Sequence, residues 1–163
     1  MSKNTIKLKK YLDINVEYEA NAELYPGHLI ELISNGKVRK HGTSGGSVLP
    51  MFALEDELQG KGIDDTYAAN APVQCWIPTR GDEVYAKLAY GQSVTVGAFL
   101  VSNGDGTLKA YDAEMVLRES SALWESTLDI QRDKIVGIAL EAIDLSSSGA
   151  YPTDHPWVKI RII

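Results

Sequence analysis

The chain has 163 residues, of which 44% are hydrophobic and 23% are charged, and its formal net charge is −6. This composition is typical of a folded protein and excludes a long disordered chain, and the length allows one domain whose core needs no disulfide or metal. No apolar run approaches the roughly 20 residues that span a bilayer, the N-terminus lacks the apolar core of a secretory signal, and the acidic balance does not favour nucleic acid as a partner.

The first ten residues are basic. No acidic residue occurs among residues 3–10, and the segment contains four lysines: Lys3, Lys7, Lys9 and Lys10. A basic segment of this kind can contact nucleic acid or an acidic protein surface, or it can be a solvated chain end. The sequence leaves both interpretations open.

A strand is predicted in residues 11–18, where hydrophobic and polar side chains alternate with a period of two. One face carries Leu12, Ile14, Val16 and Tyr18. Because the polar segment 19–23 separates this strand from the next, we expect residues 1–24 to form an extended N-terminal arm and residues 25–163 to form a β domain. A detached strand can complete the sheet of another chain, with its hydrophobic side chains filling pockets there.

Residues 28–41 predict a β-hairpin. Two short apolar runs flank Asn35-Gly36, a dipeptide that is typical of tight hairpin turns. A two-residue loop would give these facing pairs: Ser34 with Lys37, Ile33 with Val38, and Glu31 with Lys40. The second pair is apolar and the third has opposite charges, and both kinds of pair stabilise a sheet.

Further strand-like runs continue to the C-terminus, with turn residues between them. They cover residues 73–77, 83–89, 94–102, 107–111, 135–143 and 157–163. Residues 112–134 fit either a helix or a short strand. Short strands at this spacing predict a mainly β fold, a single compact domain that resembles a β-barrel or β-sandwich and carries the N-terminal arm.

The segment 54–72 is long, weakly periodic and acidic, which is typical of a functional or compact surface loop. Its carboxylates lack the alternating spacing of an EF-hand loop, so we expect a solvated or interface-facing charge cluster rather than a calcium site. The residues predicted to contact a partner are Glu55, Asp56, Asp64, Asp65 and Tyr67.

No group of residues predicts catalysis. Gly42, Ser44 and Gly46 satisfy the G-x-S-x-G pattern of serine hydrolases, but no helix signal follows Ser44 and the chain lacks alternating strands and helices. The single cysteine, Cys75, lies in an apolar run and is predicted to be buried and inert. The three histidines are far apart in sequence: His28, His41 and His155. We therefore predict no catalytic residue, no cofactor and no metal site.

Residues 25–108 resemble the capsid decoration proteins of tailed phages, which are also called head-stabilising or cement proteins. The resemblance rests on PGHLIE at residues 26–31, the loop 52–67, GDEVYA at 81–86 and GDGTL at 104–108, and the run 135–142 is similar to a late strand of that family. It implies a compact β fold, commonly trimeric, on the outside of an icosahedral shell. It also implies an N-terminal arm on the major capsid protein, and no catalytic residues.

The sequence therefore predicts a non-enzymatic virion protein that is made in the host cytoplasm and lies on the capsid exterior. Its predicted partners are the major capsid protein, whose subunits it would bridge, and further copies of itself in a homotrimer. A membrane partner is not expected. The alternatives are a tail-tube or head-completion protein, a carbohydrate-binding surface module in which tryptophans stack on sugars, and a hydrolase that uses Ser44.

Overall fold

The chain folds into antiparallel β-sheets joined by turns, so the predicted mainly β fold class is confirmed. The computed structural model describes residues 6–9, 14–111, 132–146 and 156–163. Within these residues the helical segments are two 3-10 turns, η1 (Glu57–Gln59) and η2 (Arg132–Lys134). Residues 112–131, most of the stretch that sequence left undecided, lie outside the described residues.

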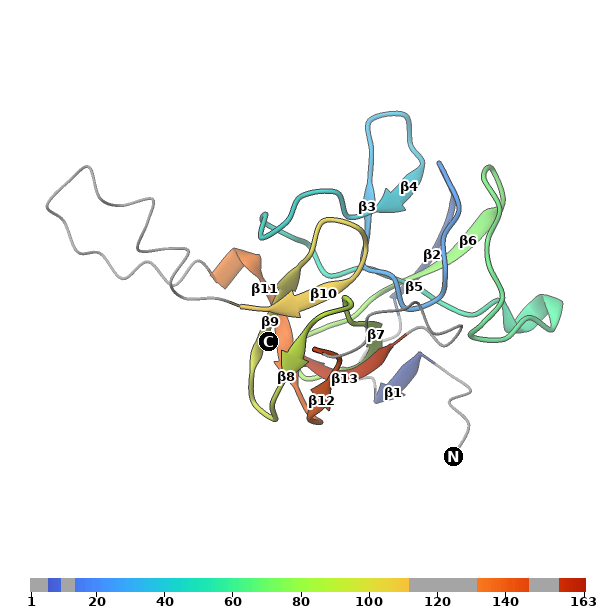
Figure 1. Cartoon of the computed structure of the whole chain (residues 1–163). Coiled ribbons are helices and arrows are strands. Elements are labelled where there is room, and N and C mark those ends of the chain that lie inside the picture. The colour runs from blue at the N-terminus through green and yellow to red at the C-terminus, as the bar shows by residue number, and fades with distance from the viewer. Residues whose placement is uncertain (1–5, 10–13, 112–131, 147–155) are drawn as a thin grey trace, which may run out of the picture.

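The largest sheet has six strands, and the C-terminal strand lies in its interior (Figure 1). Its order is β1 (Lys7–Lys9), β7 (Glu83–Lys87), β13 (Trp157–Ile162), β11 (Ile135–Ala139), β9 (Phe99–Ser102) and β10 (Leu108–Ala110). At the far edge of the sheet, Leu108 forms a parallel bridge with Leu88, which follows β7 in the chain. The N–H of Ala89 also donates a hydrogen bond to the carbonyl of Leu108 at 2.8 Å. The sheet therefore curls back towards itself as a barrel does.

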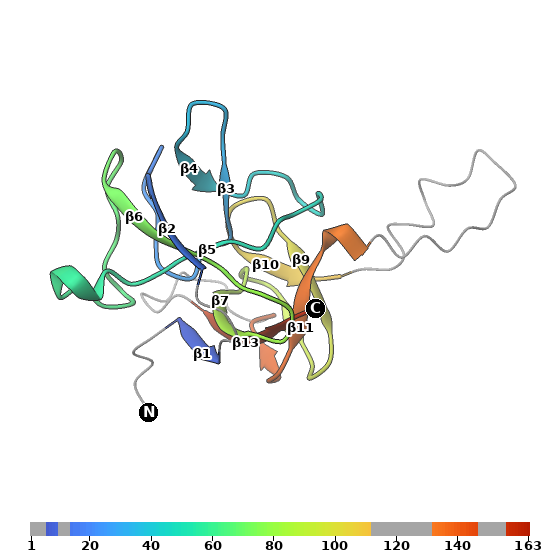
Figure 2. The same cartoon turned by 180° about the vertical axis from the view of Figure 1, so that it is seen from behind.

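Three smaller sheets surround the large one. The first is a three-stranded sheet of β2 (Ile14–Glu19), β6 (Pro72–Ile77) and β5 (Phe52–Ala53). The second is a hairpin of β3 (Ile30–Leu32) and β4 (Val38–Lys40). The third is a pair of short strands, β8 (Ser93–Val94) and β12 (Ile143–Asp144). Figure 2 shows β2 lying along β6. An antiparallel bridge between Leu29 and Phe52 joins the hairpin to the three-stranded sheet.

The apolar side chains form two clusters, because each sheet buries one face. The first core packs around the six-stranded sheet and includes Trp76 and Phe52. The second core lies under the hairpin and the three-stranded sheet and includes Tyr67 and Cys75. Cys75 is fully buried, as predicted, and burial raises the pKa of its thiol from 9.0 to about 12.

The predicted hairpin is present, but the predicted register is wrong by one residue. The facing pairs are Ile30 with Lys40, Glu31 with Arg39, and Leu32 with Val38. The loop therefore has three residues, 34–36. A two-residue type I′ loop needs a positive φ at both positions, whereas Gly36 has φ +80° and Asn35 does not have a positive φ. The Asn35 side chain instead accepts a hydrogen bond from the N–H of Lys37 at 3.0 Å.

Two predicted strands are each divided by a turn. The run 94–102 is split into β8 and β9, because the N–H of Ala98 bonds back to the carbonyl of Thr95 at 3.1 Å and Gly97 has φ +85°. The run 135–143 is split into β11 and β12. Each half then pairs with a different strand, so a continuous apolar run in the sequence serves two sheets.

Candidate interaction surface

The strand predicted in the N-terminal arm is part of the domain. β2 pairs antiparallel with β6 over its six residues, so the expectation of a detached strand is wrong for these residues. Val16 and Tyr18 pack against the second core of the same chain, where sequence alone had assigned them to pockets on a partner. Ile14 is 44% exposed, and Leu12 lies outside the described residues. Among the described residues of the predicted set Leu12, Ile14, Val16 and Tyr18, the side chain of Ile14 is the most exposed.

The first part of the acidic loop is buried. Both carboxylate oxygens of Glu55 lie 3.2 Å from the N–H of Ile6, which is itself fully buried. Asp56 is buried at the start of η1. Tyr67 is also buried, its hydroxyl donates to the Leu54 carbonyl at 2.7 Å, and burial raises its pKa above the usual 10.0. In this structure the side chains of all three predicted contact residues are buried, so they present little surface to a partner.

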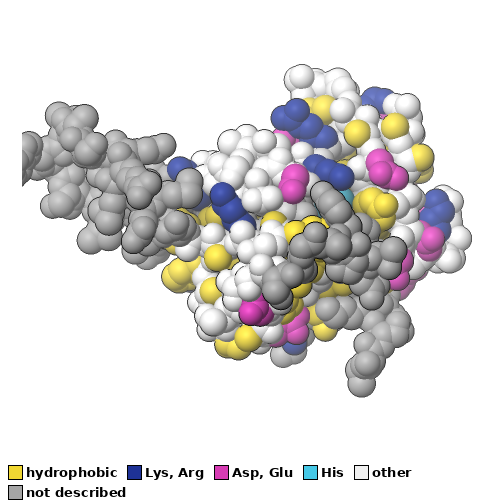
Figure 3. All heavy atoms as spheres, viewed as in Figure 1, with side chains coloured by type: hydrophobic (Ala, Val, Ile, Leu, Met, Phe, Trp, Pro, Cys, Tyr) yellow, Lys and Arg dark blue, Asp and Glu magenta, His cyan; other side chains and the backbone are white. Residues whose placement is uncertain are grey.

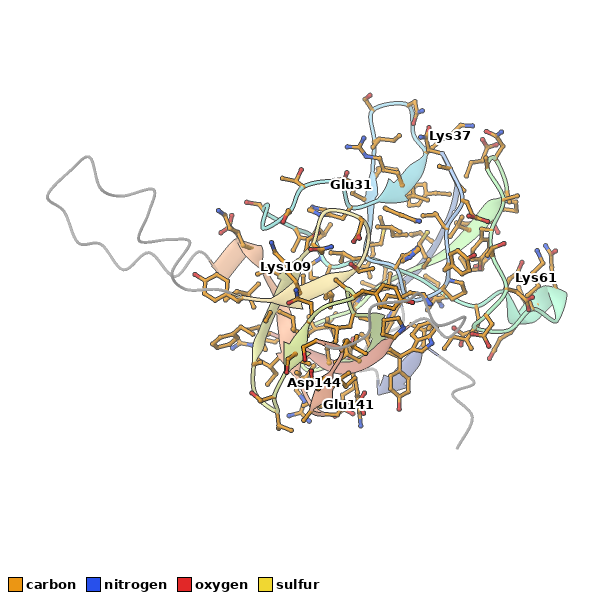
Figure 4. All side chains as sticks on the ribbon, viewed as in Figure 1. Glu31, Lys37, Lys61, Lys109, Glu141 and Asp144 are labelled. Carbon is orange, nitrogen blue, oxygen red and sulfur yellow. The ribbon has the colours of Figure 1, made fainter. Side chains whose placement is uncertain are left out.

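Beyond Asp56 the loop turns outward. Leu58, on η1, is 90% exposed. Asp64 and Asp65 are exposed, and the Asp65 carboxylate accepts a hydrogen bond from the N–H of Gly62 at 2.7 Å. We call residues 57–65 the η1 loop, which Figures 1 and 4 show at one end of the molecule with Lys61 on it. The solvent-exposed part of the predicted acidic segment 54–72 is therefore this shorter loop.

A pocket that sequence reasoning missed lies beside the β3–β4 hairpin. Its volume is about 280 Å³, and the residues that line it are Tyr18, Ile30, Glu31, Leu32, His41, Ser47, Leu49, Met51 and Ile77. We call it the hairpin pocket. Leu32 is 52% exposed and Leu49 is 72% exposed. The alternation of Ile30, Glu31 and Leu32 was a partial signal, because it places Ile30 and Leu32 on one face but does not reveal that Ile30 is buried while Leu32 is half exposed.

The polar side of the hairpin pocket is held by a buried histidine. His41 Nδ1 lies 2.8 Å from the Ser102 hydroxyl, and Nε2 lies 3.3 Å from the Ser47 carbonyl and 3.8 Å from a Glu31 carboxylate oxygen. The Ser102 hydroxyl oxygen also accepts a hydrogen bond from the N–H of Gly104 at 3.1 Å, which fixes this hydroxyl beside the ring. Although a serine, a histidine and a glutamate lie near one another, the His41–Glu31 separation of 3.8 Å is too long for a hydrogen bond and Ser102 is fully buried. A substrate carbonyl cannot reach it, and the chain of hydrogen bonds is structural.

The other chemical candidates have structural roles where the structure describes them. The Ser44 hydroxyl is exposed and accepts a hydrogen bond from Lys109 Nζ at 2.8 Å. The acid and histidine that could nominally follow Ser44 in hydrolase order are Asp154 and His155, and both lie outside the described residues. Trp76 is fully buried, and Lys87 Nζ lies 3.7 Å from the ring centre of Trp157, a cation–π contact that covers one ring face. Among the described residues, no group of three metal-ligating side chains comes together.

The face of the molecule seen in Figure 3 has mixed charge. Figure 3 shows Lys and Arg side chains among Asp and Glu side chains on the face in view, with hydrophobic groups between them. A nucleic-acid site normally needs a continuous basic face. No helix within the described ranges is long and apolar enough to cross a membrane.

The fold and the surface together define a class: a β-sheet domain with a projecting hairpin, a projecting loop and exposed leucines on both. Comparison with solved structures finds a similar fold in the crystal structure of the head fiber gp8.5 N base of bacteriophage phi29. The TM-score is 0.54, the match covers 93% of this chain and 95% of that chain, and the sequence identity is 10%. At this identity the likeness shows a shared fold. No family model matches the chain, and no curated protein sequence matches it.

Proposed function

We propose that this protein is a structural component of a phage head, which binds the outer surface of the shell and stabilises it by bridging subunits of the major capsid protein. The observation that carries the proposal is the likeness in fold to a head-fiber domain, because it spans nearly the whole of both chains. The resemblance of residues 25–108 to capsid decoration proteins supports the same role from sequence patterns alone.

The architecture suits a bridging role. Two buried apolar clusters hold the sheets together, and the hairpin and the η1 loop extend from this body at different places (Figure 1). A small contact at each place is weak by itself, but repetition over a symmetric shell adds avidity and links neighbouring subunits. No reacting group is needed for this function.

Co-sedimentation tests the function. Expanded heads of the phage whose genome encodes the chain, prepared without the protein, should bind it to saturation at a fixed copy number per shell subunit. Decorated heads should then release their DNA at a higher temperature than bare heads. Binding to isolated tails without binding to heads would contradict the proposal and favour a tail-tube protein, and glycan binding without head binding would favour a carbohydrate-binding module.

The N-terminal contact requires a point substitution, because deletion of residues 1–18 would also remove most of β2 and uncover the second core. Ile14→Asp changes a side chain that is 44% exposed, and Val96→Asp, at a position that is 66% exposed in another part of the chain, is the matched control. We expect Ile14→Asp to weaken head binding without lowering the melting temperature, and Val96→Asp to leave binding unchanged. Equal binding by the two variants would exclude Ile14 from the interface.

A further inference from the structure

We propose that Asn35, at the tip of the β3–β4 hairpin, is a site of spontaneous deamidation, and that the fold protects Asn103 from the same reaction. The tripeptide Ser-Asn-Gly occurs twice in the chain, at residues 34–36 and at residues 102–104. Asparagine followed by glycine is especially prone to this reaction, because glycine has no side chain that obstructs attack by its backbone nitrogen. The two copies therefore start from the same local chemistry, and the inference does not depend on the proposed function.

The reaction is a displacement within the main chain. The backbone nitrogen of Gly36 loses its proton to hydroxide and attacks Cγ of Asn35, so that a bond forms between these two atoms. The bond from Cγ to Nδ2 breaks, and the leaving nitrogen takes up a proton from water and departs as ammonia. A second water molecule opens the resulting succinimide ring at either carbonyl and gives aspartate or isoaspartate. A neutral amide at the tip of the hairpin thus becomes a carboxylate.

The first copy of the tripeptide has room to react. Residues 34–36 are exposed, and a Cβ on Gly36 would meet nothing within 4 Å. The N–H of Gly36 donates to the Ile33 carbonyl at 2.9 Å, and the side-chain nitrogen of Asn35 reaches the side-chain oxygen of Asn21 at 3.5 Å. Figures 1 and 2 both show the loop between β3 and β4 extending away from the rest of the molecule. Opening of such an exposed turn costs little free energy.

The second copy is held by the packing around it. Asn103 and Gly104 are half-buried, and a Cβ on Gly104 would lie 2.8 Å from the backbone nitrogen of Ser44. The N–H of Gly104 donates to the hydroxyl of Ser102, which is fully buried, at 3.1 Å. The Ser102 carbonyl accepts from the N–H of Gly45 at 2.8 Å. Ring formation here requires the loop to separate from a second segment of the chain, which is a larger opening than the hairpin tip needs.

The polar contacts of the two asparagine side chains also differ. Attack on Cγ places negative charge on the side-chain oxygen, and a hydrogen-bond donor at that atom stabilises the charge. The side-chain oxygen of Asn35 accepts from the N–H of Lys37 at 3.0 Å. The side-chain nitrogen of Asn103 instead donates to the Asp105 carboxylate at 3.1 Å. A carboxylate beside the amide opposes the developing negative charge.

Peptide mapping of the native full-length chain by mass spectrometry tests the assignment. After incubation in mildly alkaline buffer, the peptide that contains Asn35 should replace –NH₂ by –OH about 10-fold or more faster than the peptide that contains Asn103, because it needs the smaller opening. The Asn35→Gln variant should lose the fast conversion, since glutamine forms the corresponding ring less readily. The matched Asn103→Gln variant should keep the fast conversion, and circular dichroism checks that both variants are folded.

The same incubation in urea, at a concentration that unfolds the chain, isolates the contribution of the fold. The two conversion rates should then come close together, because the tripeptide is the same at both sites. Three results would overturn the proposal. They are a native chain that stays unconverted at Asn35 while the unfolded chain converts there, equal native rates at Asn35 and Asn103, and a rate ratio that is the same with and without urea. The last result would assign the difference to the neighbouring Lys37 and Asp105 rather than to the fold.

Discussion

Replacement of Gly27 by alanine should destabilise the protein by more than its backbone conformation alone explains. Gly27 has φ +80°, its N–H donates to the Ala53 carbonyl at 2.8 Å, and its carbonyl accepts from the N–H of Lys87 at 3.1 Å. A Cβ at this position would lie 2.2 Å from Cζ3 of Trp157 and 3.1 Å from the Tyr85 carbonyl oxygen. The Gly27→Ala variant must therefore move a large ring, a strand, or both.

A matched control separates the two costs. Gly36 also has φ +80°, but a Cβ there would meet nothing within 4 Å. Gly36→Ala should thus show the left-handed penalty alone, roughly 1–2 kcal/mol. Gly27→Ala carries the same penalty and adds overpacking, typically about 1–3 kcal/mol. The expected loss is about 2–5 kcal/mol, and the difference between the variants measures the steric part.

Urea unfolding monitored by circular dichroism gives the free energy of unfolding of each variant, provided that the dependence of that free energy on urea concentration (the m-value) is the same for both. Truncation of Trp157 to alanine in the Gly27→Ala background should recover part of the loss, and the double-mutant cycle should give a coupling energy of about 1 kcal/mol or more. Free energies for Gly27→Ala and Gly36→Ala that agree within about 0.5 kcal/mol would refute the close packing of Trp157 on Gly27.

Two further predictions concern buried ionisable groups. Burial raises the pKa of the Cys75 thiol from 9.0 to about 12, so between these pH values the unfolded chain releases a proton that the native state keeps. The free energy of unfolding should therefore fall as the pH rises above about 9. The Cys75→Ala variant should show a smaller fall when its stability is measured by urea titration at each pH. A native thiol that reacts with Ellman's reagent at pH 8 as fast as the unfolded protein would contradict this burial. Glu55→Gln should lower the free energy of unfolding by about 1–3 kcal/mol, because the N–H of Ile6 loses its carboxylate acceptor at 3.2 Å. An unchanged free energy of unfolding would show that this contact does not anchor the N-terminal segment.

Strand positions could be predicted where the hydrophobic period was local. The runs 73–77 and 157–163 coincide with β6 and β13 to within a residue, because a short apolar run between turn residues indicates the first strand and alternation indicates the second. The hairpin loop was harder, because a tight turn depends on the φ angles of two or three residues. Gly36 takes a positive φ and Asn35 does not, which moves the pairing by one residue and places Glu31 opposite Arg39.

The candidate surface was predicted only in part, because exposure depends on contacts between distant segments. Glu55 looks like a surface carboxylate in the sequence, yet it is buried and accepts a hydrogen bond from the N–H of Ile6, which is 49 residues away. Conversely, the sequence does not distinguish Leu58 and Leu49 from core leucines, and both are among the most exposed apolar side chains in the described residues. Residues of the hairpin pocket come from five separate stretches of the chain between Tyr18 and Ile77.

The sequence by itself determined the class of secondary structure, the places of most strands and the buried state of Cys75, because these depend on local periodicity and on turn residues. Only the tertiary structure decided which strands pair, that β2 belongs to the domain, and that β13 enters the six-stranded sheet between β7 and β11. It also decided which acidic residues face solvent. The physical reason is that pairing and burial are set by long-range packing, whose partners are not marked in the local sequence.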